Sequence, residues 1–241
     1  MTTTSPSRAW VTTGLVGLPV YGAILALTTR KPQPDQVTDP EGWARFVSSS
    51  SYLVEHIVSN VLGAVLVIFG TLALGAMLSR SRSPRLALTG AVLAAAGQIL
   101  FMVPGTISTF ATPAIGAAYV RGNQSVMGVE FSPVLGLITG VGLLLVVSGN
   151  ILLGWAVWRS EVLPRWTGVL WIIGTLTFYV FGALLGMVTI NASLATQPVG
   201  AVLLTISSAW IAWSVLRRGR GQAVPGEPVR DAVPRVEQRA R

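Results

Sequence analysis

The fold of this chain is decided by residues 52–104, which read YLVEHIVSNVLGAVLVIFGTLALGAMLSRSRSPRLALTGAVLAAAGQILFMVP. Two apolar runs, 52–78 and 86–104, are joined here by a basic turn that holds three arginines. Each run is close to or above the roughly 20 residues that an α-helix, rising about 1.5 Å per residue, needs to cross some 30 Å of hydrocarbon. The stretch therefore predicts a transmembrane helical hairpin.

The composition extends this conclusion to the whole chain. Hydrophobic residues make up 51% of the sequence and charged residues 11%, whereas about a quarter of the residues in a soluble domain are charged. A soluble core of this length could not bury so much apolar surface. We therefore expect an integral, multi-pass protein of the cell membrane, whose first partner is the lipid bilayer.

Charge, cysteine content and motifs exclude several other classes of protein. The net charge is +8, but the basic residues flank apolar runs or lie in the C-terminal tail, so we expect no nucleic-acid partner. The chain has no cysteine and one histidine, which excludes thiolate and histidine-cage metal sites. It has no Walker loop, Gly-rich dinucleotide fingerprint, His-Glu-x-x-His or Gly-x-Ser-x-Gly. We expect neither a metal ion nor another cofactor.

The predicted fold is an all-α bundle of six transmembrane helices over residues 9–216. The expected spans are 9–28, 52–78, 86–104, 131–158, 166–190 and 198–216. Residues 1–8 form a short polar N-terminus, and residues 217–241 form a basic tail that we expect to be disordered. Residues 105–120 are apolar, but Gly105, Pro113 and Gly116 interrupt them. We expect an interfacial or re-entrant segment there, with a seventh span as the alternative.

The distribution of basic residues predicts the orientation. With six spans and the N-terminus inside, 13 of the 17 lysines and arginines fall on the inner side, as the positive-inside rule expects. Both termini should therefore be cytoplasmic. The two inner turns also resemble each other, because Pro84-Arg85 recurs as Pro164-Arg165. This echo predicts a duplicated helical hairpin in parallel orientation.

Polar residues near the outer end of the spans are the first candidates for a functional site, because polar groups inside a bilayer are costly and usually have a function. Glu55 and His56 stand in the first turns of the second span. Asn60 lies one turn after His56 and shares its helix face. Gln98, on the antiparallel third span, lies in the outer half as well. These four side chains are predicted to line a pocket that opens to the outer side.

Carboxylates and aromatic rings are expected around the same pocket. Glu130 stands at the outer entrance to the fourth span, and Asp39 lies in the loop above. Five of the nine carboxylates fall on or just below the outer face. Trp171 and Tyr179 lie deeper on the fifth span, where aromatic faces could stabilise a cation. The predicted pocket is acidic, aromatic-rimmed and apolar below.

Each candidate also has a purely structural explanation, which the sequence leaves open. A glutamate in the first turn suits the dipole of a helix N-terminus, and Glu55 and His56 could merely mark the membrane interface. The two amides are of the kind that forms hydrogen bonds between membrane helices. The deep aromatic rings of Trp171 and Tyr179 could serve only for packing.

In size, in all-helical layout and in the gathering of carboxylates at one mouth, residues 9–216 resemble the membrane-bound terpene cyclases of bacterial indole-terpenoid and fungal meroterpenoid pathways. The resemblance implies an enzyme that cyclises the prenyl chain of a lipophilic isoprenoid substrate. A carboxyl group in a low-dielectric site stays protonated near neutral pH and can protonate an alkene or an epoxide oxygen. A dry cavity would then prevent early quenching of the cation by water.

The resemblance also implies roles for the candidate residues. Glu55 would be the acid, and His56 or Asn60 would orient it. Glu130 or Asp39 would act as the second carboxylate or the final base. The residues expected to contact the substrate are Asn60, Gln98, Tyr179 and Trp171.

Two other functions compete with the enzyme. The echoed hairpins and the glycine-rich helices are also typical of a transporter or an accessory membrane subunit, although no charged residue lies at mid-membrane to couple an ion. A scaffold whose basic tail binds anionic lipid is the third hypothesis, because Arg217 and Arg218 directly follow the last span.

Overall fold

The computed structural model describes residues 6–189 and 194–221, and these are helical with no strand among them. The helices are α1 Pro6–Thr28, α2 Pro40–Val47, α3 Ser50–His56, η1 Ile57–Leu62, α4 Gly63–Leu78, α5 Pro84–Thr106, η2 Ile107–Ala111, α6 Thr112–Val120, η3 Gln124–Gly128, α7 Pro133–Arg159, α8 Arg165–Thr175, η4 Leu176–Leu184, α9 Leu185–Thr189 and α10 Thr196–Gly221. The segments η1, η2 and η4 are π-helical, and η3 is a 3₁₀-helix.

Within the described residues, six helical runs are long and apolar enough to cross a membrane. They are Ala9–Thr28, Ser50–Leu78, Pro84–Val120, Pro133–Arg159, Arg165–Leu184 and Thr196–Arg218. These runs confirm the predicted all-α class with six apolar helices. Together they suggest a multi-pass membrane protein.

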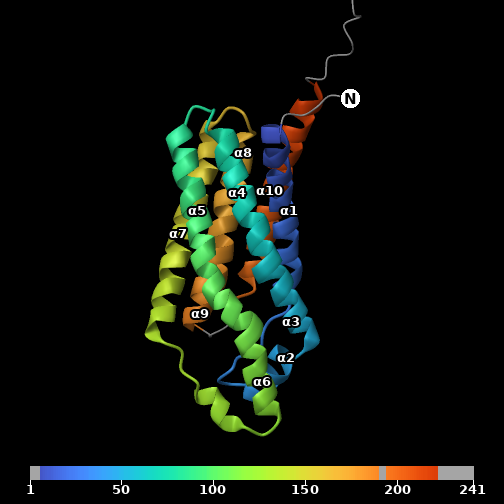
Figure 1. The fold of residues 1–241 in the computed structure, drawn as a ribbon, viewed down its shortest axis with the longest axis vertical. Helices are drawn as coiled ribbons and strands as arrows, with labels where there is room; N and C mark the ends of the chain where they lie inside the picture. The colour runs from blue at the N-terminus through green and yellow to red at the C-terminus, as the bar shows by residue number, and fades with distance from the viewer. Residues whose placement is uncertain (1–5, 190–193, 222–241) are drawn as a thin grey trace, which may run out of the picture.

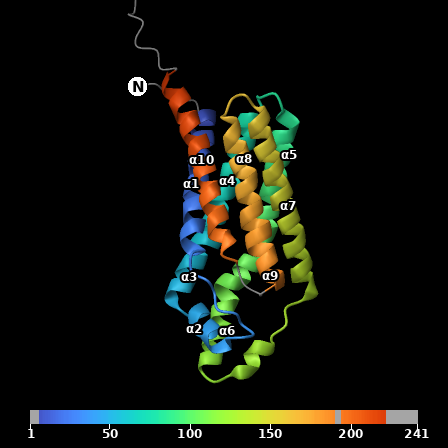
Figure 2. The same ribbon diagram turned by 180° about the vertical axis from the view of Figure 1, so that it is seen from behind.

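The six runs are arranged as a closed ring in chain order (Figures 1 and 2). α1 packs on α4, α4 on α5, α5 on α7, α7 on α8, and α8 on α10, which returns to α1. Each connection between runs therefore joins neighbours in the ring, and the α1–α10 contact closes the ring between the first and the last run. The buried side chains of the main core, such as Leu15, Leu74, Leu153 and Ile211, lie inside this ring.

The two ends of the ring differ in character. At the end that carries the start of α1, the turns 79–83 and 160–164 lie side by side, and Arg82 Nη1 is 2.7 Å from Glu161 Oε1. We name this the basic end. The opposite end carries α2, η2, α6 and η3, and we name residues 29–49 and 107–132 the cap (Figure 1). The ion pair joins the two turns, but its exposure limits its contribution to stability.

The cap contains a helix that the sequence analysis did not predict. Residues 105–120, expected to be interfacial or re-entrant, instead continue α5 through the π-helical turn η2 into α6. The run Pro84–Val120 has 37 residues, which gives a length of about 55 Å at 1.5 Å per residue. It therefore exceeds the roughly 30 Å of a hydrocarbon core, and α6 extends past the ring. Pro113 lies inside this continuous run and cannot donate a backbone hydrogen bond to the preceding turn, and the π-helical turn η2 ends just before it.

A second, smaller core holds the cap together. Trp43, Ala44 and Val47 of α2 pack with Tyr52 of α3, and α6 covers them. The backbones of α2 and α6 meet at Gly116, where a Cβ atom would lie 2.8 Å from the carbonyl oxygen of Ala44. The apolar face of α2 is thus buried against α6.

Helix ends differ slightly from the predicted spans. The fourth span is α7, which ends at Arg159. The fifth span consists of α8, η4 and α9, and the structure describes it to Thr189. The last helix does not end at residue 216 but continues to Gly221. The predictions for residues 1–5, 190 and the tail from 222 lie outside the described residues.

Glycines allow the helices of the ring to approach closely. A Cβ atom at Gly149 of α7 would lie 2.7 Å from the Cα atom of Ala94 in α5. A Cβ atom at Gly22 of α1 would lie 2.9 Å from the Cα atom of Thr205 in α10, which is the contact that closes the ring. No real Cβ contact is that short, so larger residues would push these helices apart.

We predict that Gly149→Ala destabilises the protein, because the added methyl group has no room between α5 and α7. Overpacking of this kind costs about 1–3 kcal/mol. The matched control is Gly140→Ala in the same helix, where a Cβ atom would have no heavy atom within 4 Å. That control should be neutral or gain up to about 1 kcal/mol of helix propensity. Thermal unfolding in detergent measures both, and equal midpoints would contradict the close packing.

Candidate functional site

A cavity of about 230 Å³ lies inside the ring at its cap end. Its wall is built from α1, the loop after α1, α2, α3, η1, α5, η4 and α10. We name it the ring cavity. Five of the predicted site residues line it: Glu55, His56, Asn60, Gln98 and Tyr179. The structure therefore brings together residues from the second, third and fifth spans, as expected for a pocket at this end.

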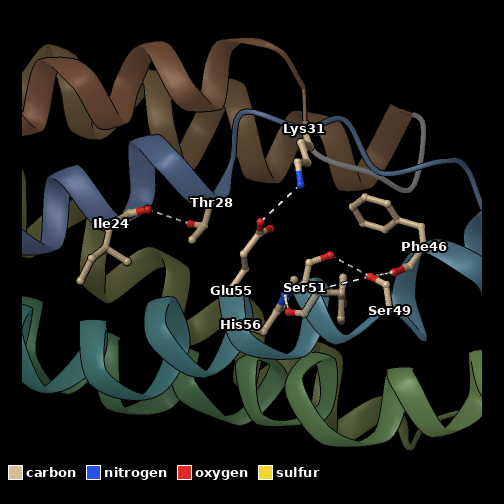
Figure 3. Close-up of polar contacts among 9 residues, drawn as sticks. Ile24, Thr28, Lys31, Phe46, Ser49, Ser51, Glu55 and His56 are labelled. Atoms are coloured by element: carbon tan, nitrogen blue, oxygen red, sulfur yellow. Dashed lines mark hydrogen bonds and ion pairs between the residues drawn. The ribbon is translucent and has the colours of Figure 1, made fainter.

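Glu55 and Lys31 form an ion pair across the mouth of the ring cavity (Figure 3). Lys31 comes from the loop after α1 and points toward the carboxylate of Glu55 on α3, with Nζ 3.6 Å from Oε1. Ionised N–H···O hydrogen bonds are usually about 2.7–2.9 Å long. The pair is thus loose, and the side chains remain 50% and 27% exposed. A ligand at the mouth would meet one positive and one negative group.

The loop that carries Lys31 is held in place by local bonds. Thr29 ends α1 by donating its hydroxyl to the Leu25 carbonyl at 2.7 Å. Further on, Asp35 Oδ1 accepts the backbone N–H groups of Val37 and Thr38 at 2.7 and 2.9 Å. The N–H groups of Thr38 and Val37 lower the pKa of Asp35, because they stabilise the ionised carboxylate.

His56 is fixed by its own helix. Its Nδ1 lies 2.9 Å from the carbonyl oxygen of Tyr52, and the two rings stack with centroids 3.7 Å apart. Because a carbonyl only accepts, Nδ1 carries the proton, and Nε2 of the neutral ring is an acceptor. The stack also joins the ring cavity to the cap, since Tyr52 belongs to the cap core and contacts Phe46, another wall residue.

Asn60 connects two runs of the ring. Its Nδ2 donates to the Gly105 carbonyl and to Thr109 Oγ1, both at 3.2 Å. Thr109 is fully buried, and its own hydroxyl donates to the same carbonyl at 2.7 Å. The structural explanation for this amide therefore holds in part, because it binds a neighbouring helix while it also faces the ring cavity.

The floor of the ring cavity is a cluster of tyrosines, a glutamine and phenylalanines. Tyr179 donates to Gln98 Oε1 at 3.3 Å, and its hydroxyl lies 3.5 Å from that of Tyr21. Both contacts are longer than the roughly 2.7–2.8 Å of an ordinary O–H···O bond. The rings of Phe101 and Phe178 meet Tyr179 edge-on at 6.1 and 4.9 Å. A ligand on this floor would contact aromatic faces and two phenol groups.

Trp171 lies in a different place from the one predicted. It lines a smaller cavity of about 20 Å³, which we name the deep cavity, beyond Tyr21 and Tyr179. Its Nε1 donates to Asn150 Oδ1 at 3.0 Å, and Asn150 in turn donates to the Val146 carbonyl. Trp171 therefore does not line the ring cavity, although Tyr21 and Tyr179 belong to both cavities.

Two predicted carboxylates also lie outside the ring cavity. Asp39 is the N-cap of α2, and its Oδ1 accepts the Gly42 N–H at 2.9 Å. Glu130 is exposed in the segment between η3 and α7 and does not belong to the cavity wall. The roles of second carboxylate and final base therefore have no geometric support from these two residues. In the described residues, no three His, Cys, Asp or Glu side chains gather to hold a metal ion.

Sequence reasoning missed several residues of the wall. Lys31, Gln33 and Gln197 come from loops or helix ends, and Tyr21 sits in an otherwise apolar first span. A signal was present for Tyr21, because a tyrosine in the middle of a span is a polar group in hydrocarbon. Lys31 had been counted only as a basic residue for orientation. Nothing in the sequence shows that the loop brings it back over Glu55.

The π-helical turns explain how the second and fifth spans supply the wall. Ser59 and Asn60 belong to η1, and Phe178 and Tyr179 belong to η4. A π-helical turn bonds residue i to i+5 and so shifts the side chains that follow relative to a regular α-helix. Such turns are frequent at functional sites. Their coincidence with the ring cavity supports a role for the cavity beyond packing.

Comparison with known proteins gives one result. A family model described as a domain of unknown function, DUF4386, matches residues 16–217. This range contains the second to fifth apolar runs, most of the first and all but the last residue of the sixth, and every predicted site residue. No curated protein and no solved structure matches the chain.

We predict that Asn60→Ala lowers the free energy of unfolding by about 1 kcal/mol, since hydrogen bonds between membrane helices contribute about 0.6 kcal/mol on average and up to about 1.7. The control is Ser148→Ala, an exposed hydroxyl that donates only within its own helix, to the Leu144 carbonyl. Its effect should stay within about 0.5 kcal/mol. If both variants unfold alike, Asn60 does not join the two runs.

Proposed function

The chain belongs to the DUF4386 family. We propose that the protein binds a small amphiphilic molecule in the ring cavity, and that this ligand enters the cavity from the cap end. The observation that carries the proposal is the convergence of polar side chains from three membrane runs on the ring cavity. Glu55, Asn60, Gln98 and Tyr179 lie within these runs. Polar groups at such positions are costly and are retained where they serve a pathway or a ligand.

The wall of the ring cavity favours a ligand with a polar head and an unsaturated or aromatic body. The mouth offers the loose pair of Lys31 and Glu55 to a polar head. The floor offers the rings of Phe101, Phe178 and Tyr179. Sites for drug-sized ligands measure about 300–1,000 Å³, so a cavity of about 230 Å³ suits a smaller molecule.

A second candidate function is acid-initiated cyclisation of a prenyl chain, as in a terpene cyclase of isoprenoid secondary metabolism. It is favoured by one observation, the carboxyl group of Glu55 above a cluster of aromatic faces in the same cavity. Glu55 would give a proton to an alkene or an epoxide oxygen, and the prenyl chain would close into a carbocycle. The resulting cation would then lose a proton, which restores the proton that Glu55 gave. Substrate and product are then isomers. This step requires Glu55 to leave Lys31 and take up a proton first.

We predict that the purified wild-type protein retains a bound small molecule, and that the Glu55→Gln variant retains at least tenfold less of it. The reason is that the amide cannot replace the charge of the carboxylate at the mouth. Extraction followed by mass spectrometry measures the bound amount. Glu130→Gln is the matched control, since it removes another carboxylate at the cap end that does not line the cavity. Equal retention by both variants would contradict the proposed site.

The same variants distinguish binding from cyclisation. Membranes with each protein are fed prenylated and epoxy-prenylated aromatic compounds, and the products are analysed by mass spectrometry. An isomer of unchanged mass, formed by wild type and Glu130→Gln but not by Glu55→Gln, would establish the cyclase. A retained ligand without any isomer would leave a binding function, as in a transporter or an accessory membrane subunit.

For the orientation, we infer that both termini and the basic end face the cytoplasm and that the cap and the mouth face outward. The count of lysines and arginines supports this, because the turns 79–85 and 159–165 fall at the basic end. The ligand would then reach the ring cavity from outside the cell membrane. The duplication of the two hairpins stays a prediction.

We predict that a cysteine at Gln124 in the cap reacts with a membrane-impermeant maleimide on intact cells, whereas a cysteine at Arg80 reacts only after permeabilisation. Both positions are exposed, and the native chain has no cysteine to interfere. The opposite pattern of labelling would reverse the orientation and place the mouth of the ring cavity in the cytoplasm.

A further inference from the structure

Thr175, the last residue of α8, has a buried hydroxyl group without a hydrogen-bonding partner among the described residues. The residue is 0% exposed. Threonine in a helix usually donates to the carbonyl three or four residues before it, as Thr71 does to Val67 at 2.8 Å. A buried polar group left unpaired is destabilising and rare. Thr175 therefore needs a partner that residues 6–189 and 194–221 do not supply.

Thr175 belongs to the wall of the deep cavity. Asn150, Ser208 and the two tyrosines of the floor are the other polar residues of this wall. The cavity measures about 20 Å³, and one water molecule needs about 10–15 Å³ together with two to four polar partners. An apolar cavity of this size would stay dry, but this one has the polar groups that a water molecule requires.

We propose that the deep cavity is a binding site for one water molecule, held by Thr175 and the polar residues around it. The hydrogen bonds already made by the wall residues leave donors and acceptors free for this water molecule. Trp171 donates to Asn150 Oδ1, Asn150 Nδ2 donates to the Val146 carbonyl, and Ser208 donates to the Leu204 carbonyl at 2.7 Å. The hydroxyl oxygens of Ser208 and Tyr21 can still accept, and Thr175 can donate or accept. The site is independent of any ligand in the ring cavity.

The water site extends the polar interior beyond the tyrosine floor. Tyr179 gives its only proton to Gln98, so the long contact with Tyr21 has Tyr21 as its donor. Glu55 and Gln98 line the ring cavity, Tyr21 and Tyr179 line both cavities, and the bound water would lie beyond these tyrosines. The two tyrosines, whose hydroxyl groups lie 3.5 Å apart, belong to the walls of both cavities.

Replacement of Thr175 by valine distinguishes a hydrated cavity from a dry one by the sign of its effect. Valine keeps the shape and removes the hydroxyl. If the water is present, Thr175→Val deprives it of a partner, and we expect the unfolding midpoint to fall by about 2–4 °C. If the cavity is dry, the same change removes an unpaired buried group, and the midpoint stays or rises. That outcome would overturn the proposal.

Thr71→Val is the matched control, because Thr71 is also buried but bonds to its own helix. It should change the midpoint by less than Thr175→Val. Thr175→Ser, which keeps the hydroxyl, should retain the water.

A second measurement uses only the wild-type protein. Radiolytic hydroxyl radicals form from bound water and oxidise the side chains beside it. Trp171 is 3% exposed and lines the deep cavity but not the ring cavity. We expect its oxidation in the folded protein, and an unlabelled Trp171 would show that no water lies there.

Discussion

Close contact between helix backbones is the constraint on which this structure depends. A ring of six apolar helices encloses a cavity only if neighbours touch all the way round, and glycines make this contact where the helices cross. Gly149 allows α7 to meet α5, and Gly22 allows α1 to meet α10, the two ends of the circuit. Lipid tails are as apolar as leucine, so the association of these helices relies on packing rather than on the hydrophobic effect. A wider separation at either crossing would open the interior to lipid.

Within the closed ring, polar side chains are placed by local departures from α-helical geometry. The π-helical turns η1 and η4 supply Asn60 and Tyr179 to the same cavity. A regular helix with these sequences would present a different set of side chains to the interior. The cap then fixes the mouth, because Tyr52 packs in the cap core and stacks on His56. Packing, helix geometry and the polar site are therefore linked.

The sequence predicted the membrane class, the six apolar runs and a pocket at one end. These features depend on hydrophobic length and on polar residues within apolar runs, which are visible in one dimension. Glu55, His56, Asn60 and Gln98 were found in this way, and the structure brings them together. The place of Lys31 depends on the path of a loop, which no periodicity records. The continuous helix over residues 105–120 was not predicted because Gly105 and Pro113 suggest breaks, whereas the helix continues through a π-helical turn and packs on α2.

The central claim is that a closed ring of membrane helices contains a polar cavity reached by water from the cap end. Single cysteines at Ser59 and Val92, in a chain that otherwise has none, test it most directly. Ser59 lines the ring cavity, whereas Val92 is 60% exposed on an apolar run. The account predicts that a charged, water-soluble thiol reagent modifies the protein in lipid vesicles at Ser59→Cys and not at Val92→Cys. Modification of neither cysteine, or of both at the same rate, would contradict it.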